Sequence, residues 1–219
     1  MKIETILPGG NERLILFFNG WGAPPSVVAH LCTGDPGTCV KVCYDYTDPA
    51  FPADLSAYRE IHLVAWSLGV WAAQSVLRNI PLASATAING TPYPVHDVWG
   101  IPVNIFEGTI DHLSEDTFLR FTRRMCGSAG VWKEYRKLKN TRSVESLKEE
   151  LRAIRKRYEE ARDETVSFPW SRAILSTADA IFPFTSLCNY WATRVSGLTY
   201  IDAPHYPFYL WNEWKQIGW

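Results

Sequence analysis

The sequence contains no stretch of about 20 apolar residues, the length that an α-helix needs to cross a bilayer. Its first residues also lack the charged segment followed by an apolar segment that marks a secretory signal peptide. These two absences argue against a membrane protein and against a secreted protein. We therefore expect a cytoplasmic protein that acts without a membrane.

Cysteine is scarce and irregularly spaced. The chain has five Cys, an odd number, and no two of them form a C-x-x-C pair. A disulfide framework uses an even set of cysteines, and structural zinc sites commonly use closely paired ligands. The pattern therefore favours reduced thiols and predicts no metal site.

Acidic and basic residues nearly balance in number, but they are unevenly distributed. The chain has 22 Lys or Arg and 23 Asp or Glu, which gives a net charge of −1. Thirteen of the basic residues and only four acidic ones lie between Arg120 and Arg157, a balance of +9 against −10 for the remainder. One segment thus carries a positive field. No recognised nucleic-acid motif accompanies this charge, so we do not expect nucleic acid as a partner.

Apolar runs and helix signals alternate along most of the chain. With 219 residues, 47% of them hydrophobic, the chain can fill one substantial core, and we expect a single domain over residues 1–219. Helices are expected at 68–79 and 185–195. The pattern predicts an α/β fold with a mostly parallel central sheet flanked by helices, entered through a short hairpin of the first two strands. The apolar runs place strands at 2–7, 13–18, 40–46, 61–65, 85–89, 173–176 and 198–201.

The alternation lapses between about residues 95 and 170, where we expect an inserted helical cap. The clearest element of this cap runs from Val144 to Ala161, because apolar residues recur there at three- and four-residue steps along one stripe. Most of the basic residues in this stretch lie off the stripe. A solvated helix face is the simplest interpretation of such a charged run.

The segment Ala65-Trp66-Ser67-Leu68-Gly69 joins an apolar strand to a helix-forming run. It differs from the G-x-S-x-G nucleophile elbow by one methyl group, and small residues on both sides of the serine permit a sharp turn. Such a turn exposes the hydroxyl at a helix N-terminus, where backbone N–H groups favour developing negative charge. We interpret Ser67 as a nucleophile, although serine also commonly caps helices.

A serine hydroxyl is a weak nucleophile near neutral pH, so it needs a histidine to accept its proton and a carboxylate to orient that histidine. Among five histidines, His205 follows the last predicted strand, which fits the chain order Ser, Asp, His. Asp179 follows the penultimate strand, with Asp111 and Asp202 as alternatives. We expect Asp179 to be the acid, because Asp111 falls in the insertion and Asp202 is placed to act on a local turn.

A glycine-rich segment, Asn19-Gly20-Trp21-Gly22, follows the predicted strand at 13–18. Its glycines permit close backbone approach, although an ordinary turn would also use them. In a hydrolase, the loop at this point and the residue after the nucleophile each contribute one N–H to the oxyanion hole. The candidate donors are therefore Trp21 and Leu68.

Together with segments 19–22 and 65–69, the segment His205-Tyr206-Pro207-Phe208 resembles the α/β-hydrolase superfamily and, within it, the BioG branch of pimeloyl-acyl carrier protein methyl ester esterases. The resemblance covers most of the chain. It implies a serine carboxylesterase that needs no cofactor and no metal. The implied substrate is a methyl-esterified pimeloyl chain on an acyl carrier protein, in biotin precursor synthesis. Relative to longer hydrolases, Asn19 stands where a histidine is usual and Ala65 replaces the first elbow glycine.

An acidic carrier protein would suit the basic segment, and we expect Arg152, Arg155 and Lys156 to contact it. Two other interpretations stay open. The same catalytic groups would serve a short-acyl esterase or a thioesterase, because they do not select the leaving group. A non-catalytic binding protein of this fold is the third interpretation, but binding alone would not require the serine, aspartate and histidine together.

Overall fold

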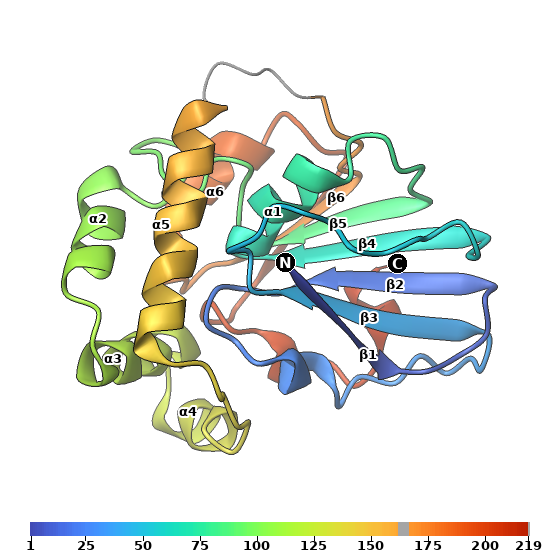
Figure 1. The fold of residues 1–219 in the computed structure, drawn as a ribbon, viewed down its shortest axis with the longest axis horizontal. Helices are drawn as coiled ribbons and strands as arrows, with labels where there is room; N and C mark the ends of the chain where they lie inside the picture. The colour runs from blue at the N-terminus through green and yellow to red at the C-terminus, as the bar shows by residue number, and fades with distance from the viewer. Residues whose placement is uncertain (162–166, 219) are drawn as a thin grey trace.

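The structure of the protein, a computed structural model, describes residues 1–161 and 167–218 (Figure 1). Within them, seven strands form one sheet in the order β1-β3-β2-β4-β5-β6-β7, and every neighbouring pair is parallel except β1 with β3. The predicted α/β class with a mostly parallel sheet is confirmed. The strands are β1 (Lys2–Leu7), β2 (Arg13–Phe18), β3 (Thr38–Tyr44), β4 (Glu60–Trp66), β5 (Ser84–Ile88), β6 (Arg172–Ser176) and β7 (Gly197–Ile201).

The pairing of the first strand shows that the predicted hairpin was wrong. β1 pairs antiparallel with β3, with Ile3 opposite Cys43, and does not pair with β2. β2 lies instead between β3 and β4 and runs parallel to both. Residues 14–18 of β2 are fully buried, so this strand is suited to a central position with cover on both faces. The partly exposed β1 takes the outer edge of the sheet.

Two α-helices of the described chain flank the sheet, α1 (Leu68–Val76) and α6 (Phe184–Trp191). Each is about one turn shorter than predicted. Other cover comes from loops and from three short 3₁₀-helices, η1 (Pro25–Val28), η2 (Phe208–Leu210) and η3 (Trp214–Ile217).

In the described part of the chain between β5 and β6 there are four α-helices, and we call residues 103–160 the cap. In Figure 1 these helices stand together at one end of the sheet, the end at which α1 begins. No helix in the described ranges is long and apolar enough to cross a bilayer. The cap helices are α2 (Val103–Asp111), α3 (Glu115–Cys126), α4 (Ala129–Tyr135) and α5 (Val144–Glu160).

The longest cap helix, α5, has the predicted apolar stripe. Leu147, Leu151, Ile154 and Tyr158 are buried, which fits their three- and four-residue spacing. Glu150 is buried as well, with only 1% of its surface exposed. A buried carboxylate needs charged or hydrogen-bonding partners, and Glu150 has them in Arg142 and in the backbone N–H of Tyr46.

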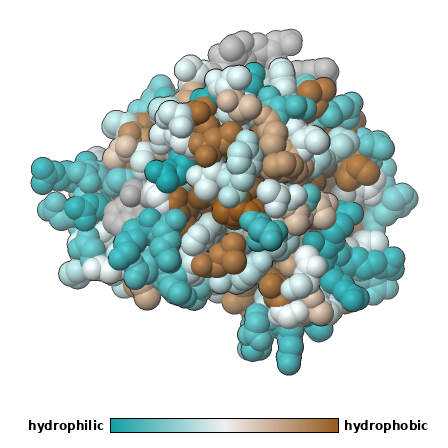
Figure 2. All heavy atoms as spheres, turned by 180° about the vertical axis from the view of Figure 1, so that it is seen from behind, coloured by the Kyte–Doolittle hydropathy of each residue, from teal (hydrophilic) through white to brown (hydrophobic). Residues whose placement is uncertain are grey.

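Aromatic side chains hold the C-terminal segment onto the sheet. Trp214 is fully buried, and its ring centroid lies 5.7 Å from that of Phe17 on β2. The Phe208 ring packs edge-on against Trp66, with centroids 5.2 Å apart. On the face seen in Figure 2, hydrophobic side chains reach the surface in several separate places with hydrophilic atoms between them. Through Trp214 and Phe208, the C-terminal segment is therefore part of the core and packs on β2 and β4.

The turn after β5 leaves no room for a side chain at Gly90, where a Cβ would lie 2.2 Å from the carbonyl oxygen of Ser67. We expect Gly90→Ala to lower the free energy of unfolding, because the backbone between β4 and α1 would have to move. Gly108→Ala in α2 is the matched control, since a Cβ there meets no atom within 4 Å. Removing a helical glycine should raise the free energy of unfolding by about 0.5–1 kcal/mol. Denaturant titration measures both variants, and parental stability of Gly90→Ala would contradict the expectation.

Candidate active site

Ser67 stands at the turn between β4 and α1. Its backbone has φ 58 and ψ −128, a conformation that non-glycine residues rarely adopt. Small neighbours make the turn possible: a Cβ at Gly69 would lie 2.4 Å from the carbonyl oxygen of Phe18, and Ala65 is fully buried between β2 and β5. Such backbone strain costs on the order of 1–3 kcal/mol and is concentrated at functional sites.

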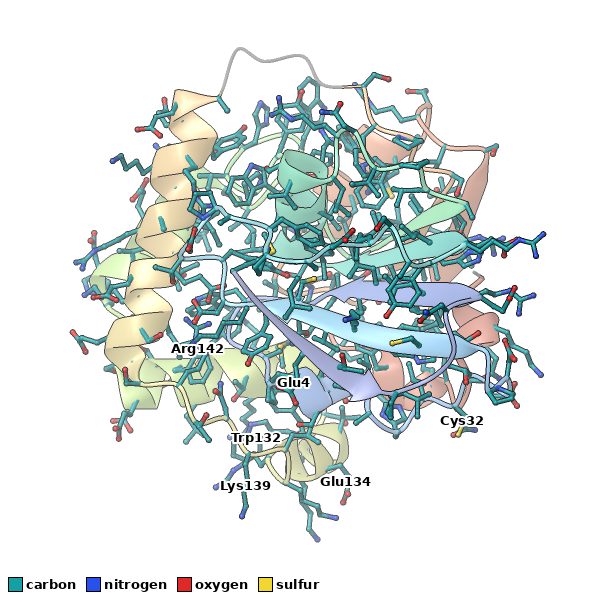
Figure 3. All side chains as sticks on the ribbon, turned by 45° about the vertical axis from the view of Figure 1, so that its right-hand side comes forward. Glu4, Cys32, Trp132, Glu134, Lys139 and Arg142 are labelled. Carbon is teal, nitrogen blue, oxygen red and sulfur yellow. The ribbon has the colours of Figure 1, made fainter. Side chains whose placement is uncertain are left out.

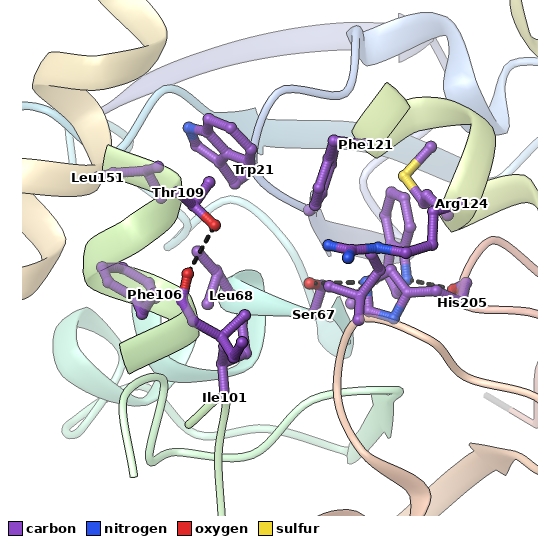
Figure 4. A pocket seen from close by; sticks show the side chains of 15 residues that line it. Trp21, Ser67, Leu68, Ile101, Phe106, Thr109, Phe121, Arg124, Leu151 and His205 are labelled. Carbon is purple, nitrogen blue, oxygen red and sulfur yellow. Dashed lines mark hydrogen bonds between the residues drawn. The ribbon is translucent and has the colours of Figure 1, made fainter. Parts of the chain in front are cut away.

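Three side chains from separate strand ends meet at this turn. The Nε2 atom of His205 lies 2.9 Å from Ser67 Oγ (Figure 4). Its Nδ1 atom lies 2.7 Å from Asp179 Oδ2. The His205 side chain is 1% exposed, and that of Asp179 is fully buried. In this arrangement the histidine can accept the serine proton while the carboxylate holds its Nδ1–H.

Asp179 is the one of the three candidate acids that reaches His205. It follows β6, and its Oδ1 atom accepts hydrogen bonds from the N–H groups of Ile181 at 2.8 Å and Phe182 at 2.9 Å. These bonds orient the carboxylate and leave Oδ2 for the histidine. Asp111 at the end of α2 and Asp202 after β7 are both exposed.

Two buried side chains that the sequence did not single out hold the backbone of His205. The His205 carbonyl accepts hydrogen bonds from Trp66 Nε1 at 2.9 Å and from Asn89 Nδ2 at 3.0 Å. Asn89 also binds Ser176 through both ends of its amide, so it joins the end of β6 to the histidine loop. The only available sequence signal for Asn89 was an Asn-Gly pair at the end of a predicted strand, which is typical of any turn.

The two residues expected to supply the oxyanion donors line the same cavity as Ser67. Leu68 is the first residue of α1, where a helix N–H lacks an intrahelical acceptor. Trp21 lies in the segment Asn19–Gly22, which we call the oxyanion loop. The cap holds this loop: Trp21 Nε1 donates to the carbonyl of Leu147 at 2.9 Å, and Asn140 Nδ2 donates to that of Gly22 at 2.6 Å.

A mainly apolar cavity opens above Ser67, between the sheet and the cap. Arg124 stands beside Ser67 and His205 in Figure 4 and also lines two neighbouring grooves on the surface. Such a cavity suits an aliphatic acyl chain whose reacting carbonyl lies at the serine. Its lining comprises Gly20, Trp21, Trp66, Ser67, Leu68, Ile101, Ile105, Phe106, Thr109, Phe121, Arg124, Met125, Leu151, Ile181 and His205.

The three expected carrier contacts lie on one face of α5, away from the cavity lining. Arg152 and Lys156 are exposed. Arg155 binds Glu107 of α2 at 2.5 Å and also pairs with Glu159. Part of the expected positive face is therefore engaged in the cap itself.

Other basic residues lie nearer the cavity. Arg120 and Arg124 of α3 line the groove that adjoins it, and Arg123 lines a second groove with them. Among the described residues, no group of three or more His, Cys, Asp or Glu is placed to hold a metal ion.

Comparison with known proteins gives a consistent picture over the whole chain. The family model described as "Pimeloyl-ACP methyl esterase BioG" matches residues 1–217. A solved structure of BioG from Haemophilus influenzae superposes with a TM-score of 0.93 at 39% identity and covers 99% of both chains. An uncharacterized protein of H. influenzae is 41% identical over 207 residues, 94% of each chain.

Two further similarities are more limited. A malonyl-[acyl-carrier protein] O-methyltransferase of Bacteroides fragilis is 41% identical over 202 residues, which cover 91% of this chain but only 40% of that protein. The structure of a putative aryl esterase from Burkholderia cenocepacia aligns with a TM-score of 0.62 at 16% identity, over 94% of this chain and 87% of the other. This last likeness shows the α/β-hydrolase fold.

Replacing each candidate acid in turn tests the geometry around His205. We expect Asp179→Asn to lower kcat for ester hydrolysis by about 10⁴, because an amide cannot hold the Nδ1–H tautomer or stabilise the imidazolium. Asp111→Asn and Asp202→Asn are matched controls and should stay near the parent rate. Steady-state kinetics on an activated ester, with circular dichroism to check folding, gives the order. A larger loss in Asp111→Asn than in Asp179→Asn would show that the acid had been misassigned.

Proposed function

Since the chain belongs to the BioG family of pimeloyl-ACP methyl esterases, we propose that it is a serine carboxylesterase that hydrolyses the methyl ester of a pimeloyl chain bound to an acyl carrier protein. The observation that carries the proposal is the hydrogen-bonded line of Ser67, His205 and Asp179 at an apolar cavity. The reaction would release an intermediate of biotin synthesis. A cytoplasmic location fits this carrier-bound substrate.

The catalytic cycle uses two acyl transfers. Ser67 Oγ attacks the ester carbonyl while His205 takes its proton, and the resulting oxyanion accepts hydrogen bonds from the Trp21 and Leu68 N–H groups. The intermediate collapses, and His205 returns the proton to the departing methoxide, which leaves as methanol. A water molecule, deprotonated by His205, then attacks the acyl-serine and releases the carboxylic acid. Asp179 orients His205 and stabilises its protonated form throughout.

The cavity supports a substrate that enters with its ester end first. The ester of such a substrate lies at the far end of the pimeloyl chain from the carrier, so the chain must extend from Ser67 to the protein surface. Apolar side chains of both core and cap suit its methylene groups, among them Leu68 and Ile181 outside the cap and Phe106 within it. The carrier itself would then rest on the outside of the cap.

A short-acyl esterase or thioesterase is the second candidate, because Ser67, His205 and Asp179 act on the carbonyl and not on a particular leaving group. Methyltransferase activity is not proposed for this chain, because the chain spans only 40% of the B. fragilis relative that bears that name.

Mass spectrometry of carrier-bound substrates separates these activities. Incubation with methyl pimeloyl-carrier should lower the mass of the carrier species by about 14 mass units, because converting a methyl ester to an acid removes one CH₂. A carrier bearing a simple acyl thioester should stay intact. Ser67→Ala is the control and should leave both unchanged, since it lacks the nucleophile. Release of free carrier from the thioester, with the methyl ester untouched, would replace the proposal with a thioesterase.

We propose that the basic face of α5 guides the carrier, and charge reversal tests this role. Arg152→Glu combined with Lys156→Glu spares the ion pair between Arg155 and Glu107 of α2 and should lower kcat/KM for methyl pimeloyl-carrier by about tenfold at low salt. The loss should shrink as salt rises, while hydrolysis of a small free ester stays unchanged.

Two further variants define the surface that the carrier uses. Arg59→Glu, 77% exposed just before β4 at the opposite end of the sheet, is the matched control and should have no effect. Arg120→Glu with Arg123→Glu tests the second groove, which both residues line. If only this α3 pair lowers kcat/KM for the carrier substrate, the carrier rests on α3 and the α5 residues form a solvated face.

A further inference from the structure

Tyr46 is a buried tyrosine that follows β3 and reaches the oxyanion loop. Its side chain is 1% exposed, and its hydroxyl donates a hydrogen bond to the carbonyl of Asn19 at 2.7 Å, with the carbonyl of Cys43 farther away at 3.1 Å. Burial raises the pKa of the Tyr46 hydroxyl well above its ordinary value. The hydroxyl therefore keeps its proton and remains a donor.

The peptide between Asn19 and Gly20 is fixed at both ends. Its carbonyl accepts from Tyr46, and its N–H, which belongs to Gly20, donates to Asn19 Oδ1 at 3.0 Å. The other end of the Asn19 amide donates to the carbonyls of Ala23 at 3.0 Å and Pro24 at 3.1 Å. Because a peptide unit is planar, these contacts set the orientation from which the next peptide must start.

The next peptide carries the Trp21 N–H. Gly20 lies against Trp66, so that a Cβ there would come within 2.8 Å of the indole ring. The Gly20 carbonyl accepts from the N–H of Ala23 at 3.3 Å. In a trans peptide the carbonyl and the N–H point in opposite directions, so this bond turns the Trp21 N–H away from the Gly20–Ala23 turn.

Helix α5 holds the main chain of Tyr46. The Tyr46 N–H donates to Glu150 Oε1 at 2.8 Å, and its carbonyl accepts from the guanidinium of Arg157. Glu150 is itself paired with Arg142 at 2.5 Å, and Arg142 also binds Asp45 at 3.2 Å. Figure 3 shows Arg142 at the junction of cap and sheet. Tyr46 is thus held by the cap at its backbone and holds the oxyanion loop with its hydroxyl.

From these contacts we propose that Tyr46 is a positioning residue: its hydroxyl fixes the Asn19–Gly20 peptide and so aims the Trp21 N–H, while Glu150 and Arg157 of the cap keep Tyr46 in place. The inference rests on the proposed role of Trp21 as an oxyanion donor. It gives the cap a second task, because α5 then supports the reacting centre as well as covering the substrate.

Tyr46→Phe removes the hydroxyl and keeps the ring. Loss of a whole oxyanion donor lowers kcat by about 10²–10³, so a misaimed donor should lower kcat for p-nitrophenyl butyrate by roughly tenfold to 10². KM should stay unchanged, because the ground-state ester does not need this N–H. Affinity for a boronic acid, which forms a tetrahedral anion on Ser67, should fall in parallel with kcat. A purely structural loss would not move kcat and boronate affinity together while KM stayed constant.

Tyr58→Phe is the matched control, because it removes a tyrosine hydroxyl bonded to Cys39 Sγ at 3.4 Å, away from the cavity lining. It should keep the parent kcat and boronate affinity. Parent values of both quantities in folded Tyr46→Phe would overturn the inference.

The Glu150 variants pose the same question if Tyr46→Phe does not fold. Glu150→Gln keeps an oxygen acceptor for the Tyr46 N–H, so it should lose less kcat than Glu150→Ala, with KM unchanged in both variants. Equal kcat in these two variants would also overturn the inference. The proposed substrate is tested separately. If the parent protein hydrolyses p-nitrophenyl butyrate but not methyl pimeloyl-carrier, the proposed substrate is wrong, whereas the Tyr46 test remains valid.

Discussion

Close backbone contact between three strand ends is the constraint on which the site depends. A Cβ on Gly69 would lie 2.4 Å from the carbonyl oxygen of Phe18, and one on Gly90 would lie 2.2 Å from that of Ser67. The ends of β2, β4 and β5 therefore approach to distances that exclude side chains. This contact holds Ser67 in its strained conformation and brings the oxyanion loop beside it, because a rare backbone conformation persists only when its surroundings enforce it.

Buried contacts also fix the position of the cap on the sheet. Glu150, Arg142 and Asp45 form a buried or nearly buried ion cluster between α5 and the turn after β3. Burial raises the pKa of the Glu150 carboxyl, and the positive charge of Arg142 opposes that shift. Buried ion pairs add little net stability, but removing one partner typically costs about 3–5 kcal/mol. We expect such a cluster to fix the position of the cap on the sheet more than it stabilises the fold. The bond from the Tyr46 N–H to Glu150 links that position to the residue whose hydroxyl holds the oxyanion loop.

Much of this arrangement could be predicted from local sequence patterns. The change from an apolar strand to a helix at Ser67, the apolar stripe of α5 and the strand ends before Asp179 and His205 all depend on residues close together in the chain. The central sheet brings those strand ends together because its strands are parallel, so three side chains far apart in the sequence lie within hydrogen-bonding distance. The basic residues were harder to interpret, since the position of Arg155 beside Glu107 depends on how α2 packs on α5.

The sequence by itself determined the order of the strands along the chain, the positions of α1, α5 and α6 to within about one turn, and which residue types stand at the strand ends, because periodicity and turn chemistry act over a few neighbouring residues. Only the tertiary structure decided that β1 pairs with β3, that Asn89 joins the β6 end to the histidine loop, and that Tyr46 contacts both Asn19 and Glu150. Each of these contacts joins residues distant in the sequence. The hydrogen bonds form because packing brings buried polar groups within reach of one another. No local sequence pattern specifies which groups will meet.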